Sequence, residues 1–137
     1  MVKAEDFWNY LCNGLEYRFF SGIPCKGLNF LYDKMNVEFM HYVPAINERI
    51  AVNLVNGAYL TGVKGAILLP AEKIFTFDFN NKNDLPLFVI TSGETIPRGV
   101  YTLELKDDLE GCLNKLAKRN KPGVLFIPEE GKWKDIL

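Results

Sequence analysis

The sequence predicts an α/β protein with a three-layer α/β/α arrangement, in which helices cover both faces of a mainly parallel sheet. Segments that are apolar throughout are typical of parallel strands, because both faces of such a sheet are buried. Residues 65–69, 86–91 and 123–128 have this character. Segments with helical spacing of apolar residues are interleaved with them. With 137 residues, the chain is expected to form a single domain, 1–137.

The first part of the chain predicts a helix, a strand and a second helix. Residues 4–12 carry apolar side chains at helical spacing, and Asn13-Gly14 follows as a stop signal. Residues 17–20 are short and aromatic, as in a buried strand, and run into the loop Ser21-Gly22-Ile23-Pro24. A second helix is expected over residues 27–35.

The middle of the chain predicts a strand, a long helix and the first of the apolar strands. Residues 37–43 alternate as a strand does, so His41 would be a partly buried histidine on an apolar face. The long helix begins at Asn47-Glu48, and Gly62 stands where a left-handed C-cap residue belongs. Its predicted apolar face consists of Ile50, Ala51, Leu54, Val55, Ala58 and Tyr59.

The last part of the chain predicts one more helix between two apolar strands. Residues 74–79 alternate with period two, as a strand does. A parallel sheet, however, requires a helix between the flanking strands, so the secondary structure of this segment stays open. A helix is expected over residues 107–119. Its inward side chains would be Leu109, Cys112, Leu113 and Leu116.

Composition excludes several classes of function. A formal net charge of −1 and the lack of a basic patch argue against nucleic acid as a partner. Three separated cysteines and one histidine indicate neither a disulfide framework nor a metal site, and they suit a reducing cytoplasm. The amino terminus lacks the features of a signal peptide, and no apolar stretch is long enough to cross a membrane. The sequence therefore predicts a soluble cytoplasmic protein.

Glu48 is the first candidate for a functional residue. It lies just past the carboxyl end of the strand that runs to Val43, and ligands of open α/β sheets gather at such ends. The alternative is that Asn47 caps the helix and Glu48 is an ordinary acid of its first turn. Residue pattern alone leaves both interpretations open.

The stretch around Glu48 also resembles a known family. Asn47-Glu48, Ala51-Val52 and the run Gly57-Ala58-Tyr59-Leu60-x-Gly62 are similar to the pyrimidine-binding (Pyr) domain of thiamine diphosphate enzymes. The resemblance is greatest to the alpha subunit of sulfopyruvate decarboxylase and its phosphonopyruvate decarboxylase relatives. Residues 20–24 with Leu28 resemble the first strand and loop of that family, and residues 121–128 resemble its last strand.

The resemblance implies a function shared between chains. In the family, the Pyr domain holds the aminopyrimidine of thiamine diphosphate, and a PP domain on a partner chain binds the diphosphate through magnesium. Glu48 would exchange a proton with the pyrimidine ring, with Asn47, Pro24 and Cys25 as further cofactor contacts. The implied substrate is a 2-oxo acid, the implied partner a PP-domain beta subunit, and the chain would form a homo-oligomer.

The catalytic role requires that the Glu48 carboxyl group be partly protonated near neutral pH. An apolar pocket that includes Ile46 and Ile50 would favour the protonated form. The amino end of a helix favours the carboxylate instead. The sequence does not decide which of the two effects is larger.

Three other residues have both a functional and a structural interpretation. Cys25 lies at the mouth of a predicted helix on the ligand side of the sheet, where it would contact ligand or simply pack. Lys26 and Arg98 would bind the anionic group of the substrate, or they are exposed surface charges.

The sequence departs from the family after the strand that ends at Leu69. The relatives carry a glycine-rich turn there, whereas this chain reads Pro70-Ala71-Glu72-Lys73, which cannot give the open backbone of glycine. The loop over residues 92–99 is also short. A second hypothesis is therefore a non-catalytic binding or regulatory subunit with the Pyr fold. A third is a small-molecule-binding α/β domain unrelated to thiamine.

Overall fold

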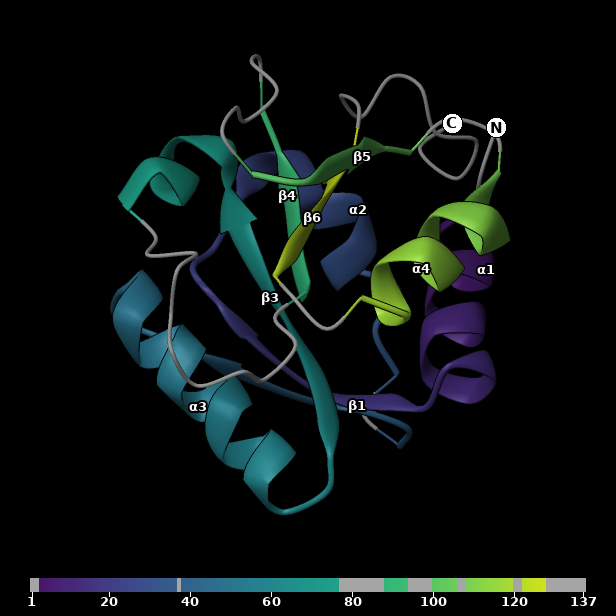
Figure 1. The fold of residues 1–137 in the computed structure, drawn as a ribbon, viewed down its shortest axis with the longest axis horizontal. Coiled ribbons are helices and arrows are strands. Elements are labelled where there is room, and N and C mark those ends of the chain that lie inside the picture. Colours follow the sequence, from purple (N-terminus) through teal and green to yellow (C-terminus); the bar gives the residue numbers. More distant parts are fainter. Residues whose placement is uncertain are drawn as a thin grey trace.

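The computed structural model describes residues 3–36, 38–76, 88–93, 100–105, 108–119 and 122–127. Within these residues six strands form one sheet, in which every pair of neighbours is parallel (Figure 1). The order across the sheet is β2-β1-β3-β4-β6-β5. The strands are β1 (Tyr17–Gly22), β2 (His41–Pro44), β3 (Lys64–Pro70), β4 (Phe88–Ser92), β5 (Thr102–Glu104) and β6 (Gly123–Ile127).

Helical segments connect these strands. Helix α1 (Ala4–Trp8) continues without a break into the π-helical turn η1 (Asn9–Gly14). A 3-10 turn η2 (Lys26–Leu28) leads into the short α2 (Asn29–Tyr32). The longest helix in the described residues is α3 (Glu48–Leu60). A 3-10 segment η3 (Ala71–Thr76) follows β3, and α4 (Leu109–Ala117) precedes β6.

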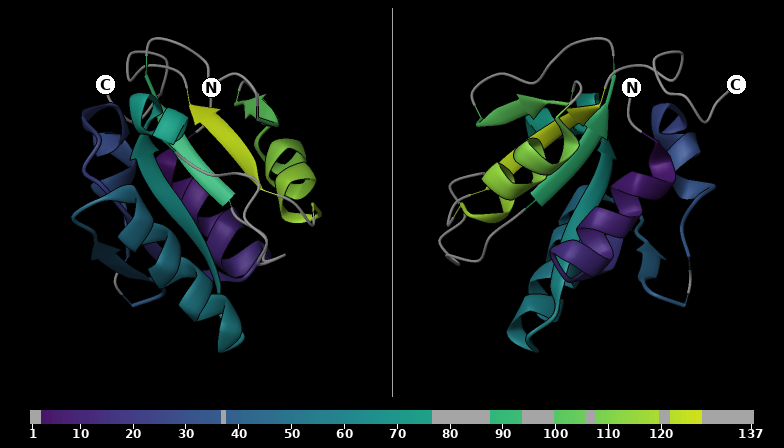
Figure 2. Two further views of the ribbon diagram at one scale, coloured as in Figure 1. Left: turned by 60° about the vertical axis from the view of Figure 1, so that its left-hand side comes forward. Right: turned by 90° about the vertical axis from the view of Figure 1, so that its right-hand side faces the viewer.

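Helical segments cover both faces of the sheet, which confirms the predicted fold class (Figure 2). One face packs against α1, η1, α2 and α4 in a core that includes Ala66 and Leu68 of β3. The other face packs against α3 and η3, and Ile67 and Leu69 of β3 belong to that second core. Because alternate residues of β3 enter different cores, the strand is apolar along its whole buried length.

Several boundaries differ from those predicted. The predicted strand 37–43 was wrong over residues 38–40, since β2 begins only at His41, and residue 37 lies outside the described residues. The Asn36 side-chain oxygen accepts a hydrogen bond from the Glu38 amide at 3.0 Å, and the Asn36 carbonyl accepts one from Phe39. These hydrogen bonds hold the chain in a turn, so the residues before His41 do not form a strand. His41 is exposed on the edge strand, so its interpretation as a partly buried residue was wrong.

Three other differences concern element ends. The second helix reaches only Tyr32, three residues short of the predicted end. Strand β5 was missed by the sequence analysis. Of the segment 74–79, whose state was open, the first three residues belong to η3 and the others lie outside the described residues.

The long helix follows the prediction closely, and its ends are set by capping. The Asn47 side-chain oxygen accepts a hydrogen bond from the amide of Ile50 at 3.0 Å, which satisfies one donor of the first turn. At the other end, Gly62 has the left-handed φ of 87° that the sequence predicted for it. Of the predicted apolar face, Ala51 and Val55 are fully buried, whereas Ile50 is exposed.

The strand order creates one point where ligands of α/β proteins commonly bind. From β1 the chain passes through α2 to β2 on one side, whereas from β3 it proceeds to β4 on the other side. The carboxyl ends of β1 and β3 therefore flank a topological switch point. Gly22 ends β1 there, beside the backbone of Leu68. The next residue, Ile23, donates a hydrogen bond to the Leu68 carbonyl at 3.1 Å.

None of the helices in the described part of the chain combines the length and the apolar composition that a bilayer crossing requires.

Buried tyrosines predict how stability depends on pH. Burial raises the pKa of Tyr32 and Tyr59 far above the ordinary value of 10.0, and in each case a neighbouring tyrosine adds to the shift. Burial also raises the pKa of Tyr17 and Tyr42. The folded state thus keeps protons that the unfolded chain releases above about pH 10, so stability falls as the pH rises beyond that value.

We expect the free energy of unfolding to decrease above pH 10 by up to about 1.4 kcal/mol per pH unit for each such tyrosine. Tyr32→Phe and Tyr59→Phe should each make the free energy of unfolding less dependent on pH, by up to about 1.4 kcal/mol per pH unit. Guanidinium unfolding at a series of pH values between 9 and 11.5, followed by circular dichroism, measures the slope. A free energy that stays constant across this range would contradict the prediction.

Candidate functional site

Glu48 is the first residue of α3 and follows the carboxyl end of β2 by four residues. Asn47 occupies the N-cap position with extended backbone, φ −148° and ψ 172°. Because the Asn47 side chain caps the helix, the carboxyl group of Glu48 is not needed for that purpose. The Glu48 side chain is half-buried. The site thus contains a partly shielded acid whose backbone is fixed by a neighbouring residue.

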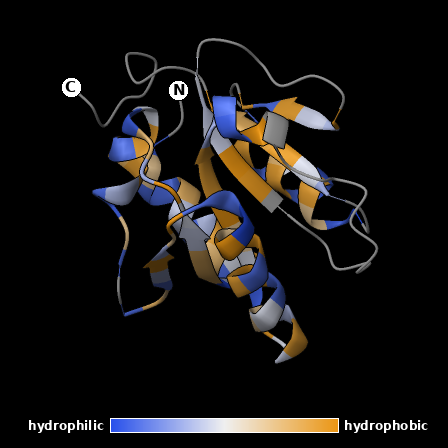
Figure 3. Ribbon diagram, turned by 90° about the vertical axis from the view of Figure 1, so that its left-hand side faces the viewer, coloured by the Kyte–Doolittle hydropathy of each residue, from blue (hydrophilic) through white to orange (hydrophobic). Residues whose placement is uncertain are grey.

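Exposed apolar side chains flank Glu48 in the sequence. Ile46 exposes 88% of its surface, and Val43 and Ile50 expose 39% each. Val43 lies in the edge strand β2, Ile46 in the connection that follows it, and Ile50 in the first turn of α3. Figure 3 shows that apolar and polar residues are mixed along α3, on the outside of the sheet. Large apolar residues gathered at one place on a surface often mark a contact with another molecule. We name Val43, Ile46 and Ile50 the apolar rim.

The loop after β1 approaches the carboxyl end of β4. Pro24 is exposed, whereas Cys25 is buried and belongs to the core on the α1 face. The Cys25 sulfur lies 3.9 Å from the carbonyl oxygen of Ser92, at the carboxyl end of β4. Burial raises the pKa of the Cys25 thiol, which keeps it neutral. Cys25 and Glu48 thus lie toward the same edge of the sheet, but their elements pack on opposite faces.

The other predicted site residues have less structural context. Lys26 begins η2 and is exposed. Arg98 lies outside the described residues. For Glu48, Asn47, Pro24, Cys25, Lys26 and Arg98, contact with a cofactor or substrate stays a prediction.

Sequence reasoning missed polar residues at the end of the central strand β4. Thr91 and Ser92 are buried. The hydroxyl of Thr91 has no hydrogen-bond partner in the part of the chain that the structure describes, and it alternates with Ile90 to face the α3 side together with Val89. The signal that could have found them is the change from apolar to small polar residues at the carboxyl end of an apolar run.

The glycine-free turn after β3 closes part of this edge. Strand β3 ends at Pro70, and η3 begins directly with Ala71, which is buried. A Cβ atom added to Gly93 would lie 2.8 Å from the Cβ of Ala71. The turn after β3 is therefore packed tightly against the residue that follows β4.

Within the described ranges, no group of three or more His, Cys, Asp or Glu residues is placed to hold a metal ion.

Solved structures with this fold include enzymes that use thiamine diphosphate. The chain is similar to benzoylformate decarboxylase from Polynucleobacter necessarius, with a TM-score of 0.77, 16% identity, and coverage of 98% of this chain and 31% of that one. A Mycobacterium smegmatis protein described as a thiamin diphosphate-dependent enzyme gives 0.75 and 16%, with 97% and 31% covered. For 2-oxoglutarate:ferredoxin oxidoreductase from Magnetococcus marinus the values are 0.68 and 13%, with 96% and 30% covered.

Sequence comparisons find no such relatives. No known family profile matches the chain, and no curated protein matches it. The chain spans about a third of the length of the solved structures that it resembles. At this level of identity the likeness establishes the fold, which is that of a Pyr-type domain of thiamine diphosphate-dependent enzymes.

Proposed function

We propose that this chain is the Pyr-type alpha subunit of a thiamine diphosphate-dependent 2-oxo acid decarboxylase, with Glu48 as the residue that activates the cofactor. The proposal depends chiefly on one observation, the half-buried carboxyl group at the start of α3 in a chain with this fold. The likeness to the sulfopyruvate and phosphonopyruvate decarboxylases suggests a substrate of that kind.

The surroundings of Glu48 suit a carboxyl group that holds and releases a proton. The apolar rim would exclude water from this acid once another chain covers it, and the loss of water favours the protonated form. The amino end of α3 favours the carboxylate. A group that exchanges a proton requires both forms to be accessible. The proposal therefore requires that coverage by the partner chain offset the preference of the helix end for the carboxylate. The cofactor, when bound, supplies the stabilisation of negative charge that decarboxylation needs.

The proposed partner is a beta subunit that carries a PP domain and binds magnesium and the diphosphate. The apolar rim supports a partner chain at this place, because contact with another chain would remove its exposed apolar surface from water. Self-association of the alpha subunit is part of the same proposal. Sedimentation of the chain alone tests it, and a purely monomeric chain at high concentration would count against it.

The proposed substrate carries a second anionic group besides its carboxylate. Lys26 is exposed beside the buried Cys25 in the loop after β1, at the carboxyl edge of the sheet. Its ammonium group can form charge-assisted hydrogen bonds with a sulfonate, phosphonate or carboxylate. Arg98 is assigned the same role on sequence grounds alone.

One observation favours a second candidate, a non-catalytic subunit with the same fold. The close packing of Ala71 against Gly93 occupies space where the decarboxylase relatives are expected to have an open glycine-rich backbone. A subunit changed in this way could keep its pairing surface and lose its cofactor contact.

Calorimetric titration separates the two candidates. Thiamine diphosphate and magnesium are titrated into the chain alone, into a candidate beta subunit alone, and into their mixture. A catalytic alpha subunit should give tight, saturable binding only in the mixture. If the two chains associate but the cofactor binds no better than to the beta subunit alone, the non-catalytic candidate is correct.

A further inference from the structure

A cavity of about 260 Å³ lies between the first helix and the connection that leads from α2 to β2. One wall comes from a single face of α1 and η1, and the other comes from Lys34, Asn36, Phe39 and Met40. None of its lining residues belongs to the proposed decarboxylase site. The volume is slightly below the range of about 300–1,000 Å³ that is usual for drug-sized ligands, so a smaller molecule fits it.

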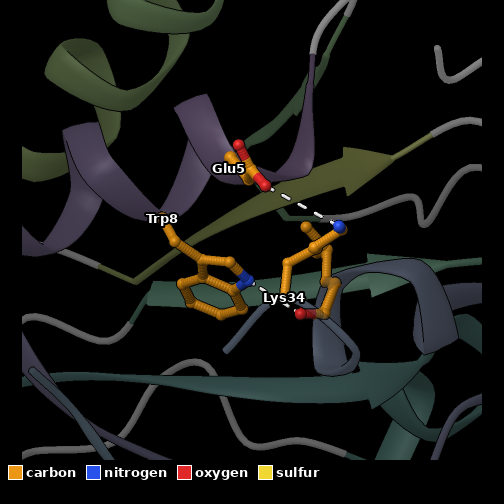
Figure 4. A network of polar contacts seen from close by, with 4 residues as sticks. Glu5, Trp8 and Lys34 are labelled. Carbon is orange, nitrogen blue, oxygen red and sulfur yellow. Dashed lines mark hydrogen bonds and ion pairs between the residues drawn. The ribbon is translucent and has the colours of Figure 1, made fainter. Parts of the chain in front are cut away.

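The floor of the cavity, formed by its most buried lining residues, is apolar. It contains Trp8, Cys12 and Met40, all of which are buried. The indole nitrogen of Trp8 donates a hydrogen bond of 2.8 Å to the carbonyl oxygen of Leu31, which fixes the ring (Figure 4). Burial raises the pKa of Cys12 to about 11, so this thiol is uncharged at neutral pH. The floor therefore offers apolar contact and no charge.

The entrance of the cavity carries a pair of opposite charges. Glu5 and Trp8 stand one turn apart on α1, and Figure 4 shows the Glu5 carboxylate directed at the ammonium group of Lys34. The oxygen and nitrogen are 3.7 Å apart, and the two side chains are 69% and 42% exposed. An exposed pair at this distance contributes little to stability, so a ligand can separate it at little cost.

Carboxamides supply further polar groups around the cavity. Asn13 donates a hydrogen bond of 2.8 Å to the side-chain oxygen of Asn9, and both residues line the cavity. This bond leaves the Asn9 amino group and the Asn13 oxygen to face other partners. The cavity thus combines a neutral apolar floor, neutral polar walls and one cation beside one anion.

We propose that this cavity binds a small zwitterion with an apolar tail, of the α-amino acid class. The ammonium group of the ligand pairs with Glu5, its carboxylate pairs with Lys34, and its side chain lies against Trp8 and Met40. A simple anion would be repelled by Glu5 and a simple cation by Lys34, whereas a zwitterion satisfies both charges. The site is separate from Glu48, so its existence does not depend on the proposed decarboxylase activity.

The test is titration of the whole protein with L-leucine and L-methionine, followed by amide NMR spectra and calorimetry. N-acetyl-L-leucine lacks the ammonium group and L-leucinamide lacks the carboxylate. We expect saturable binding of the free amino acids, with shifts at the amides of residues 5–13 and 34–40. Each capped compound should bind about twofold to fivefold more weakly, which is the contribution expected of an exposed ion pair.

Two variants and two controls locate the site. Glu5→Gln and Lys34→Gln should each weaken binding of L-leucine by about twofold to fivefold, and both should fold because the pair is exposed. Asp6→Asn and Asp33→Asn change exposed charges next in sequence to the pair and should leave the affinity unchanged.

Three results would overturn the proposal. They are the absence of saturable binding by either amino acid, equal affinity for free and capped leucine, and unchanged affinity in both charge variants. Thermal unfolding and the dispersion of the amide spectra establish that each variant is folded before its affinity is compared.

Discussion

Replacing Glu48 by glutamine should lower the turnover of the reconstituted decarboxylase by about two to four orders of magnitude, the usual contribution of a positioned acid or base. Glutamine has nearly the same shape and can still donate a hydrogen bond, but it cannot exchange a proton. The fold should be unaffected, because Asn47 and not Glu48 caps α3. Steady-state kinetics of the alpha and beta subunits mixed at saturating cofactor provides the measurement.

Two control variants distinguish a catalytic loss from a structural one. Arg49→Gln changes the next, exposed residue of the same helical turn and should retain near-normal turnover. Glu48→Asp keeps a carboxyl group but shortens its reach, so its turnover should lie between those of the wild type and Glu48→Gln. Sedimentation of each mixture shows whether the subunits still associate.

The outcome is informative in either direction. If Glu48→Gln retains near-normal turnover, the assignment of Glu48 as the activating residue is wrong. If Arg49→Gln loses as much activity as Glu48→Gln, the start of α3 acts through subunit association and not through proton exchange. A loss confined to Glu48→Gln, with association and cofactor binding intact, supports the proposed role.

The central strands could be predicted from sequence because burial on both faces leaves an unambiguous pattern. Residues 65–69 and 123–127 are apolar throughout, and the structure places them in β3 and β6, where every one of them is buried. The edge strands gave a weaker signal. Strand β5 has three residues, all partly exposed, so neither a continuous apolar run nor a clear alternation marks it.

The error at residues 37–43 has a local cause. The alternation of apolar and polar residues suggested a long strand, but the side chain and carbonyl of Asn36 bond to amides two and three residues later. An asparagine that accepts hydrogen bonds from nearby amides favours a turn over a strand. Phe39 is consequently exposed, and its carbonyl oxygen accepts a hydrogen bond of 3.0 Å from Arg18.

The candidate site was predictable only where its signal is local in sequence. Asn47 and Glu48 are adjacent, and capping preferences identify them as the start of a helix. The approach of Cys25 to Ser92 depends on which strand ends meet across the sheet, and strand order is not written in a local pattern. Thr91 differs from Cys25 in this respect, because the change from apolar to small polar residues at the end of β4 is a local signal.

Gly22→Ala should destabilise the protein by about 3 kcal/mol or more, since overpacking against backbone cannot be relieved by rotating a side chain. A Cβ atom at this position would overlap the carbonyl oxygen of Leu68 on the neighbouring strand. That oxygen also accepts the hydrogen bond from Ile23, and the Gly22 carbonyl accepts one from Ala45 at 2.8 Å. Moving β1 away from β3 would therefore disturb the residues that precede both Cys25 and Glu48.

Gly57→Ala is the matched control for this substitution, because it adds the same methyl group elsewhere. Gly57 lies within α3, and an added Cβ would meet no atom within 4 Å apart from its chain neighbours and the backbone of its own helix. Alanine should therefore stabilise the helix by roughly 0.5–1 kcal/mol. Guanidinium unfolding of both variants gives the two changes in free energy. Opposite signs support a close approach of β1 to β3 at the switch point, and a Gly22→Ala protein as stable as the wild type would show that the two strands are farther apart there.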